Sequence, residues 1–294
     1  MTEYISFNEE MKRRYGCKVY RLAVDGGCTC PNRDGTIGTR GCIFCLNGSG
    51  AFAETEGESV SERLEKAKKL VEHKNPGGKY AAYFQSYTNT YGDKNRLEKM
   101  FREAAAAKDI VAISVATRPD CLPDDIIAML ADINGTTPVW VELGLQTIHE
   151  KTAEYIRRGY GLSVYDSAVR RLKKAGLETV VHMIAGLPGE SREDIIETAD
   201  YIGKSGADGI KIQLLHVLRG TDLAADYERG GFELPTLEEY AEIVAGCIKV
   251  LPKNMVIHRL TGDGDRKNLI APLWSLDKKR VLNTITKVLR EQLP

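Results

Sequence analysis

The chain has 294 residues, of which 43% are hydrophobic and 28% are charged, with 41 basic and 41 acidic side chains. This composition excludes global disorder, because there are enough apolar residues to bury a full core. Because the formal net charge is zero, the protein cannot attract nucleic acid through its overall charge. A local basic face that binds nucleic acid is compatible with a net charge of zero.

The sequence contains no targeting or membrane-spanning segment. No run of about 18 apolar residues occurs, so no membrane span is expected. Residues 1–14 are polar and lack the apolar core of a signal peptide. A cytoplasmic location is therefore expected, and thiols stay reduced in that compartment. The seven cysteines then need an explanation other than disulfide bonds.

Apolar, β-branched runs recur along the chain, and a helical pattern follows each of them. From the second run onward they begin 29 to 39 residues apart, which leaves room for one strand, one helix and two loops. Nearly continuous apolar runs are typical of parallel strands that are buried on both faces. The predicted strands are residues 19–24, 80–85, 110–116, 139–145, 178–185 and 209–216.

The segments between the strands carry helix signals. An apolar stripe predicts a helix over residues 60–71. Capping boxes are predicted at residues 163–166 and 191–194, with Asp in the usual place of Glu, and Gly176 is predicted to end the first of these helices. A further helix is expected to open at Thr236, and a last one is expected over residues 276–293.

Six β/α units are two short of a complete eight-fold barrel. The sequence therefore predicts an α/β fold, a partial (β/α)6 barrel of the TIM type with a wide lateral mouth. An open doubly wound sheet is the alternative, but the first strand lacks a G-x-G-x-x-G turn. We expect residues 1–230 to form the barrel, with a functional loop at 26–58. We expect residues 231–294 to form a small, mainly α-helical C-terminal extension that closes the barrel mouth.

Four of the seven cysteines, Cys28, Cys30, Cys42 and Cys45, fall within 18 residues of that loop. All four together would make a closed tetrahedral zinc site. Cys30, Cys42 and Cys45 alone would hold an iron–sulfur cluster in which one iron has no protein ligand. The spacing leaves both metal sites open. The loop follows the first strand, so it lies at the carboxyl end of the sheet, where barrel active sites are found.

Residues 30–45 read CPNRDGTIGTRGCIFC, and this motif resembles radical S-adenosylmethionine (SAM) enzymes. It is similar in particular to the bacterial group marked by C-P-N-R-D-G-T-x-G-x-x-G-C-x-F-C, which is related to the catalytic subunit of Elongator and to oxygen-independent coproporphyrinogen oxidase. The resemblance continues through segments 83–91, 117–120, 142–146, 186–189 and 258–263, and so covers nearly the whole chain.

The resemblance implies a [4Fe–4S] cluster on Cys30, Cys42 and Cys45. Cys28 stands where this group often has an aromatic residue, so it is interpreted as a departure and not as a ligand. The second implied cofactor is SAM itself, bound at the strand ends. The implied SAM contacts are Gln85, Ser86, Thr117, Asp120, Gln146, Arg158 and His182, with Arg118 suited to a carboxylate and Arg157 as the alternative to Arg158.

Two of these assignments need a qualification: one departs from the motif of relatives, and the other has a competing interpretation. Gln85 and Ser86 replace the glycine/acid motif that accepts the methionine ammonium in relatives. For His182, a hydrogen-bonded core histidine is the competing interpretation.

The implied reaction is reductive cleavage of SAM to methionine and a 5′-deoxyadenosyl radical, which abstracts a hydrogen from the substrate. The kinship with Elongator implies tRNA as the substrate, with 5-carboxymethylaminomethyl-(2-thio)uridine at the wobble position converted to the 5-aminomethyl nucleoside. The implied partners are tRNA, a reducing protein such as flavodoxin or ferredoxin, and a downstream tRNA methyltransferase, with no membrane.

Two alternatives stay open beside this function. One is a radical SAM enzyme with a small-molecule or porphyrin-type substrate. The other is a non-catalytic RNA-binding or assembly protein that is stabilised by zinc on all four cysteines. For the tRNA hypothesis, the side chains expected around the cluster mouth are Lys12, Arg13, Arg14, Arg21, Arg33 and Arg40, with Tyr87 and Tyr91 available to stack on a base.

Overall fold

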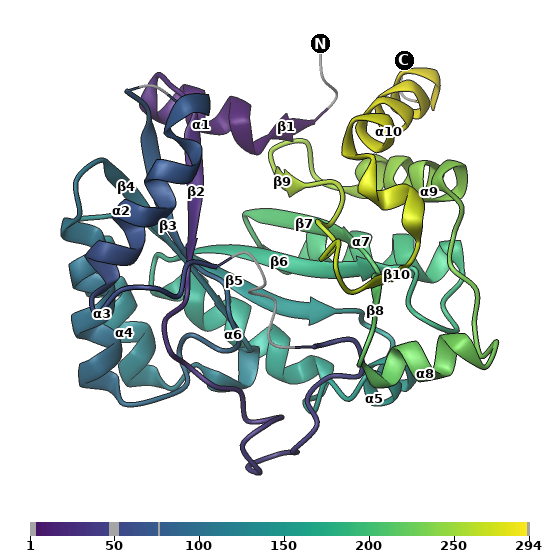
Figure 1. Cartoon of the computed structure of the whole chain (residues 1–294), viewed down its shortest axis with the longest axis horizontal. Coiled ribbons are helices and arrows are strands. Elements are labelled where there is room, and N and C mark those ends of the chain that lie inside the picture. Colours follow the sequence, from purple (N-terminus) through teal and green to yellow (C-terminus); the bar gives the residue numbers. More distant parts are fainter. Residues whose placement is uncertain (1–3, 47–52, 76, 293–294) are drawn as a thin grey trace.

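A computed structural model describes residues 4–46, 53–75 and 77–292. One curved sheet of eight parallel strands, in the order β1-β9-β7-β6-β5-β4-β3-β2, forms a half-barrel with helices packed on its outer face (Figure 1). The strands are β1 (Ile5–Ser6), β2 (Val19–Val24), β3 (Lys79–Phe84), β4 (Ile110–Thr117), β5 (Val139–Gln146), β6 (Glu178–Ala185), β7 (Gly209–Leu214) and β9 (Val256–Arg259). A separate antiparallel pair joins β8 (Val217–Leu218) to β10 (Leu269–Ala271).

All six predicted strands are present as β2 to β7, and the predicted α/β partial barrel is confirmed. The two additional strands of the sheet, β1 and β9, have two and four residues and were not among the six predicted strands. β9 pairs with β7 on one side and with β1 on the other. The segment that follows residue 230 therefore contributes to the sheet itself, in addition to its helices.

The helices confirm most of the predicted signals. Capping boxes are present at Ser191 and Thr236, and Gly176 follows its helix with a left-handed φ of 71°. The capping box predicted at residues 163–166 is wrong, because the helix already begins at Leu162 with Gly161 as its N-cap. The α-helices are α1 (Phe7–Tyr15), α2 (Val60–Val71), α3 (Lys94–Ala106), α4 (Asp124–Asn134), α5 (Glu150–Tyr155), α6 (Leu162–Lys174), α7 (Arg192–Ser205), α8 (Asp222–Glu228), α9 (Leu237–Val250) and α10 (Lys278–Gln292). None of the helices in the described part of the chain is long and apolar enough to cross a membrane.

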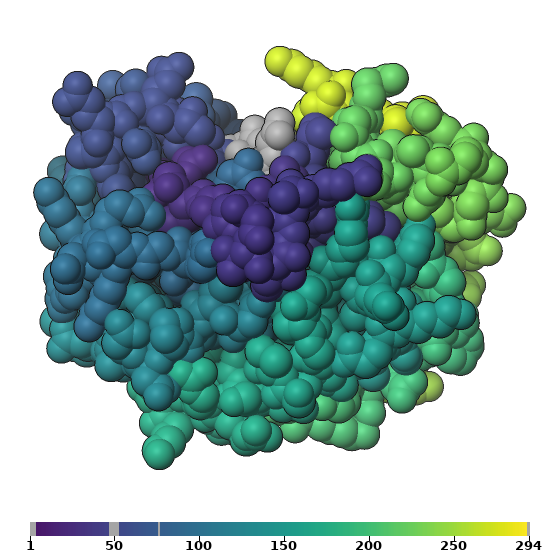
Figure 2. Space-filling model, turned by 90° about the horizontal axis from the view of Figure 1, so that it is seen from below, coloured from purple at the N-terminus to yellow at the C-terminus, as the bar shows by residue number. Residues whose placement is uncertain are grey.

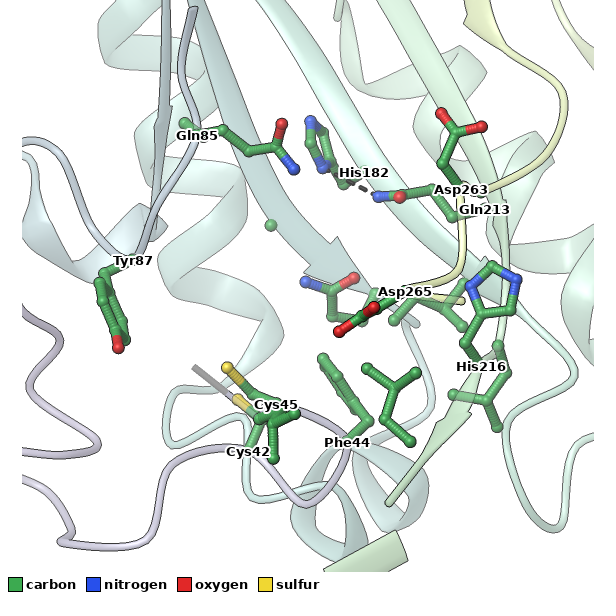
Figure 3. A pocket seen from close by; sticks show the side chains of 18 of the residues that line it. Cys42, Phe44, Cys45, Gln85, Tyr87, His182, Gln213, His216, Asp263 and Asp265 are labelled. Carbon is green, nitrogen blue, oxygen red and sulfur yellow. Dashed lines mark hydrogen bonds between the residues drawn. The ribbon is translucent and has the colours of Figure 1, made fainter. Parts of the chain in front are cut away.

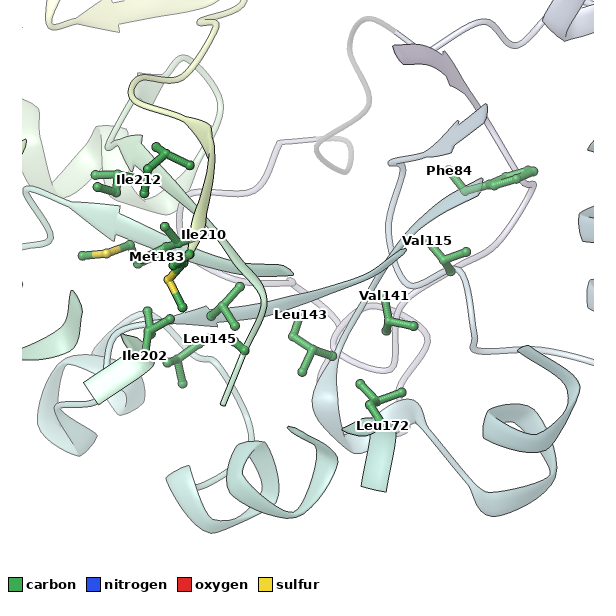
Figure 4. Packing of buried hydrophobic residues seen from close by; sticks show 14 of the residues in the cluster. Phe84, Val115, Val141, Leu143, Leu145, Leu172, Met183, Ile202, Ile210 and Ile212 are labelled. Carbon is green, nitrogen blue, oxygen red and sulfur yellow. The ribbon is translucent and has the colours of Figure 1, made fainter. Parts of the chain in front are cut away.

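Side chains alternate between the two faces of the sheet, as the period of two in a strand requires. In β5, Leu143 and Leu145 point outward and pack under the helices in the main core (Figure 4). Glu142, Gly144 and Gln146 point to the inner face and line a pocket. The apolar outer face holds the barrel together, and the inner face supplies the chemistry.

Helix α1 covers the amino ends of the strands. Its Met11 is buried in a small cluster with Trp140, and Phe7 meets the Trp140 ring edge-on at 5.7 Å. Arg13 and Arg14 on this helix form ion pairs with Glu10 at 2.7 and 2.5 Å. The expectation that the basic residues of segment 12–14 surround the cluster mouth is therefore wrong, because they lie at the opposite end of the barrel.

Candidate active site

The carboxyl ends of the strands open into a pocket of about 640 Å³, which is within the usual size range of ligand sites. In Figure 3, Cys42 and Cys45 point their sulfurs into the same space that Gln85 and Asp265 face. The predicted site residues that line the pocket are Cys30, Cys42, Cys45, Gln85, Thr117, Gln146, Arg158 and His182. Two other predicted residues, Ser86 and Asp120, lie next to the pocket without lining it.

Arg33 closes the cysteine loop, which we define as residues 26–46. Its Nη2 donates to the carbonyl oxygens of Cys45 at 2.5 Å and Leu46 at 2.9 Å. Gly41 has a φ of 73°, and a Cβ at this position would lie 2.9 Å from Arg33 Nε. A glycine is therefore required for the loop to fold around the guanidinium. Arg33 thus lines the pocket, as expected, but its guanidinium donates to carbonyl oxygens of its own loop.

Asn32 anchors the loop to the turn that follows α5. The side chain is 4% exposed, and its Nδ2 lies 2.8 Å from the carbonyl oxygen of Arg157 and 3.5 Å from Cys42 Sγ. The Ile43 amide also donates to the Ile156 carbonyl at 3.2 Å. The loop and turn are thus fixed together, and a side-chain N–H points at the sulfur of one cysteine. Arg157 takes a left-handed φ of 57° in this turn, a strained conformation for a residue with a side chain.

Cys28 lies apart from the other three cysteines. It is buried in the main core and does not line the pocket. Arg96 Nη2 donates to its Sγ at 3.2 Å, and burial raises the pKa of the Cys28 thiol. Burial and the neighbouring Cys45 raise the pKa of Cys42 to about 11. Cys28 therefore contacts Arg96 and lies outside the pocket that the other three cysteines line.

The spacing of the sulfurs bears on which metal group fits. Within residues 4–46, 53–75 and 77–292, no three cysteine sulfurs lie within 4.8 Å of one another. A single tetrahedral zinc, with Zn–S bonds near 2.3 Å, needs its sulfurs roughly 4 Å apart. A four-iron cluster is larger and takes more widely spaced thiolates. Three pocket cysteines, a glycine-lined loop and an N–H aimed at sulfur fit a [4Fe–4S] cluster.

The strand ends supply polar groups suited to the SAM molecule. Gln146 ends β5 with a left-handed φ of 72°, and its buried Oε1 has no hydrogen-bond partner in the described structure. Thr117 shares a 2.5 Å hydroxyl hydrogen bond with Thr90. Such a strained, unpaired amide at a pocket wall is typical of a ligand-binding position.

Three of the predicted SAM contacts already have protein partners. Asp120 binds Arg118 through two hydrogen bonds of 2.9 and 2.7 Å, and so orients a guanidinium that does line the pocket. Arg158 is 2% exposed and donates to the carbonyl oxygens of Thr147 at 2.6 Å and Tyr160 at 2.9 Å. The Ser86 carbonyl accepts from the Asn89 amide at 3.1 Å.

A buried charge network lies beneath the pocket, and we call it the pocket floor: Arg21, Tyr83, Ser114, Glu142, His182 and Lys211. Glu142 is 1% exposed and accepts from Ser114 Oγ at 2.5 Å, from His182 Nε2 at 2.7 Å and from Lys211 Nζ. Burial alone would raise the pKa of Glu142, but Lys211 and His182 hold it well below its ordinary value. Lys211 also donates to the Tyr83 hydroxyl at 3.0 Å. Glu142 and Lys211 thus have their hydrogen-bonding groups satisfied at the centre of the floor, whereas the buried Nε of Arg21 has no partner among the described residues.

His182 is held neutral in one tautomer. Gln213 Nε2 donates to its Nδ1 at 3.0 Å, so the ring proton is assigned to Nε2, which donates to Glu142. Burial, together with nearby Lys211, lowers the pKa of His182 to about 4. The competing interpretation of a hydrogen-bonded core histidine thus describes its contacts, although one face of the ring lines the pocket.

The far wall of the pocket comes from segment 259–278, and most of its polar residues were not predicted. Asp263 binds Lys278 at 2.6 Å and Arg259 at 3.3 Å. His216 lies against the glycines of this segment, because a Cβ on Gly262 would fall 2.8 Å from its Cε1. Its buried Nε2 lacks a partner among the described residues, and burial lowers its pKa to about 4. Acidic and basic groups thus alternate along this wall.

The floor could have been found in the sequence. Glu142 and Lys211 are single charges inside otherwise apolar strands, reading VWVELGLQ and GIKIQL. Charges at such positions are almost never buried without a partner, so each implies the other. In segment 259–278, residues 259–263 belong to the segment that carries the resemblance, whereas residues 264–278 carry no comparable signal, because their place at the mouth depends on the pairing of β9 with β7.

Residues 34–202 match the Radical SAM superfamily, and residues 207–291 match the Radical_SAM C-terminal domain. The chain is 42% identical to the protein YtqA of Bacillus subtilis, over 98% of this chain and 90% of that protein. It is 30% identical to the tRNA uridine(34) acetyltransferase of Methanocaldococcus jannaschii, over 52% of this chain and 28% of that protein. The solved structure of archaeal Elp3 from Methanocaldococcus infernus superposes with a TM-score of 0.68 at 20% identity, over 93% of this chain and 63% of that one, and so shares its fold.

Proposed function

Because the chain belongs to the radical SAM superfamily, we propose that it modifies the wobble uridine of tRNA. The cofactors of the family are a [4Fe–4S] cluster and SAM. Once bound, they supply one-electron cleavage of the sulfonium to methionine and a 5′-deoxyadenosyl radical. The other elements of the function depend on this chain's own side chains, which bind, orient and enclose the reactants.

In this proposal Cys30, Cys42 and Cys45 hold the cluster and Cys28 does not. Gln146 offers its unpaired carbonyl oxygen to the methionine ammonium, and Arg118 offers its guanidinium to the carboxylate. Asp120 acts through Arg118, which it orients, and so is a positioning residue.

One observation carries the proposal: a single pocket joins the three cysteines to a wall of mixed charge. The 5-carboxymethylaminomethyl group has both an ammonium and a carboxylate, so it needs partners of both signs. Asp265 faces the pocket in Figure 3, and Arg259 lines the same wall. The relative from Methanocaldococcus jannaschii acts, by its name, on uridine 34 of tRNA, which supports the same nucleotide here.

The proposed reaction removes the carboxymethyl part by oxidation. The methylene carbon between the nitrogen and the carboxylate loses a hydrogen atom and an electron, and water then cleaves the resulting C=N bond. SAM, the modified nucleoside and water give methionine, 5′-deoxyadenosine, the 5-aminomethyl nucleoside, glyoxylate and one proton. The electron lost by the substrate replaces the one that cleaves SAM, so this balance requires no further oxidant, and a reducing protein such as flavodoxin is needed only to prime the enzyme.

The test is an anaerobic assay of the reconstituted enzyme with SAM, a reductant and tRNA that carries 5-carboxymethylaminomethyluridine. We expect 5′-deoxyadenosine, glyoxylate and the 5-aminomethyl nucleoside in equal amounts, the last measured by mass spectrometry of digested tRNA. The matched control is the same tRNA with unmodified uridine 34. Release of 5′-deoxyadenosine with no change in tRNA would overturn tRNA as the substrate and favour a small molecule. Bound zinc with no nucleoside release would overturn the enzyme assignment.

A further inference from the structure

The charge of the chain is divided unequally along its length. Residues 253–294 contain nine Lys or Arg and four Asp or Glu, a net charge of +5. Because the whole chain is neutral, residues 1–252 carry a net charge of −5. The last seventh of the chain is therefore a basic region on an otherwise slightly acidic protein.

Helix α10 presents most of this charge on one face. Val281, Ile285 and Leu289 are buried, and the helix packs along α9 (Figure 1). At 100° per residue, the opposite face of the helix carries four basic side chains. These four, which we call the basic face, are Lys279, Arg280, Lys287 and Arg290, and all are exposed.

The charges of the basic face are not neutralised by the protein. Lys279, Arg280 and Arg290 form no ion pair with any described residue, and Lys287 lies 3.9 Å from Glu291 with its side chain 76% exposed. Elsewhere on the surface, exposed basic side chains such as Arg13, Arg102 and Lys204 are paired with acidic neighbours. Other exposed lysines, such as Lys173 and Lys174 on α6, also form no ion pair with a described residue. The basic face differs from them because four exposed basic side chains lie together on one side of one helix that starts at the pocket.

The basic face begins at the pocket. Lys278, the first residue of α10, lines the pocket wall together with Arg266. The next two residues, Lys279 and Arg280, open the basic face, which then follows a helix about 22 Å long. Figure 2 shows the dark purple cysteine loop between the blue amino-terminal half and the green and yellow segments that include α10. A nucleotide in the pocket would therefore have its flanking backbone beside this helix.

We propose that the basic face of α10 binds tRNA phosphates next to the nucleotide that enters the pocket. This inference rests on the proposed function, because it takes the partner to be the tRNA substrate. Unpaired lysine and arginine side chains on one exposed face are the electrostatic signature of a phosphate-binding surface. Phosphate contacts fix the position of a nucleic acid, and the pocket then selects the base.

A nucleic acid fits this surface better than a membrane. A helix that lies on a bilayer inserts an apolar face between the lipids. The apolar face of α10 is already buried in the protein, and the outer face has Asn283 and Thr286 between its basic residues. On the described helix, Leu282 is the large apolar side chain that is left exposed, at 38%, and one partly exposed leucine is too little apolar surface to hold a helix in a bilayer.

The test compares tRNA affinity of the reconstituted enzyme with that of a Lys279→Gln, Arg280→Gln, Lys287→Gln variant, at several salt concentrations. We expect the variant to bind at least about tenfold more weakly, and the slope of log affinity against log salt to fall by about 2 to 3. The matched control is Lys173→Gln, Lys174→Gln on α6, which removes exposed charges from another helix and should bind like the wild type. Iron content and 5′-deoxyadenosine release without tRNA show that both variants are folded and loaded.

The outcomes separate the two proposals. Suppose that the wild type binds and modifies tRNA and that the α10 variant has the same affinity and salt slope. Phosphate binding by the basic face is then overturned, and tRNA is kept as the substrate. If the wild type leaves tRNA unmodified, the proposed function fails, whatever the variant does. If the variant loses binding to phosphatidylglycerol vesicles and keeps its tRNA affinity, the surface is a membrane site and the inference is wrong.

Discussion

The cysteine loop and the pocket floor are two neighbouring parts of the same pocket, and they differ in how fully their polar groups are satisfied. On the floor, Glu142 has three hydrogen-bond donors and Lys211 has two acceptors. Around the loop, Arg157 has a left-handed backbone, and so has Gln146 across the pocket, with its buried oxygen unpaired among the described residues. The floor therefore contributes to stability, and the loop side keeps strain and unmet hydrogen bonds for ligands.

The largest expected effect is on cluster assembly, which should be lost in one cysteine variant of the loop and kept in another. Cys42→Ala should abolish cluster assembly and SAM cleavage, because a cluster with two remaining thiolates is not held. Cys28→Ala should keep about four irons per chain and its activity, because Cys28 contacts Arg96 instead of the pocket. Iron and sulfide analysis with 5′-deoxyadenosine assays checks both. Loss of iron in the Cys28 variant would contradict the comparison.

The next largest effect concerns the stability of the floor. Lys211→Met should lower the free energy of unfolding by about 3 to 5 kcal/mol, because the buried carboxylate of Glu142 loses its nearest cation and keeps only the more distant Arg21, at 4.0 Å. A double variant, Lys211→Met with Glu142→Leu, should recover part of that loss, because the uncompensated carboxylate is removed while the largely buried Arg21, 4.0 Å from Glu142, loses its acidic partner. Urea unfolding under anaerobic conditions measures both. A single variant within about 1 kcal/mol of the wild type would show that the floor is not an ionic core.

A smaller effect is expected at Asn32, on the loop side. Asn32→Ala removes an N–H that points at Cys42 Sγ and the anchor to the Arg157 carbonyl. We expect about a 10- to 100-fold loss of activity and a more negative reduction potential, because donors to sulfur stabilise the reduced cluster. Potentiometric titration followed by electron paramagnetic resonance measures the shift. Asn134→Ala, which removes a buried-strand contact to Val139 far from the cysteines, is the control and should leave the potential unchanged.

The smallest effect is a pH dependence that arises from the floor. The pKa of His182 is about 4 in the folded protein, below its ordinary value of 6.5, so the unfolded chain binds the proton more readily. Stability from this group is complete above pH 6.5 and falls as the pH drops toward 4. Between pH 7 and pH 5, the wild type should lose about 2 kcal/mol more than His182→Gln. Equal losses in the two proteins, measured by urea unfolding, would place the ring in contact with water.

The sequence was sufficient for the parts of the molecule that are encoded locally. Each of the six central strands is a mostly apolar run, and the motif around Cys42 and Cys45 carries the family resemblance. It was insufficient where position depends on distant contacts. β1 and β9 are short strands whose place depends on distant pairing, β9 with β7 and β1 with β9. Arg158 was assigned to SAM from its spacing, yet the backbone carbonyls of Thr147 and Tyr160 accept its N–H groups.

The parallel pairing of β1 with β9 has a consequence for how the protein is made. Ile5 is aligned with Val256, so the two partners are separated by about 250 residues of chain. At a synthesis rate of about 5 to 20 residues per second, β1 waits roughly 12 to 50 s for β9 to leave the ribosome. The six central strands are made in that interval and have only local neighbours to find. Addition of the edge strand β1 to the sheet is therefore a late event in biosynthesis, and the cysteine loop is synthesised well before the sheet has all its strands.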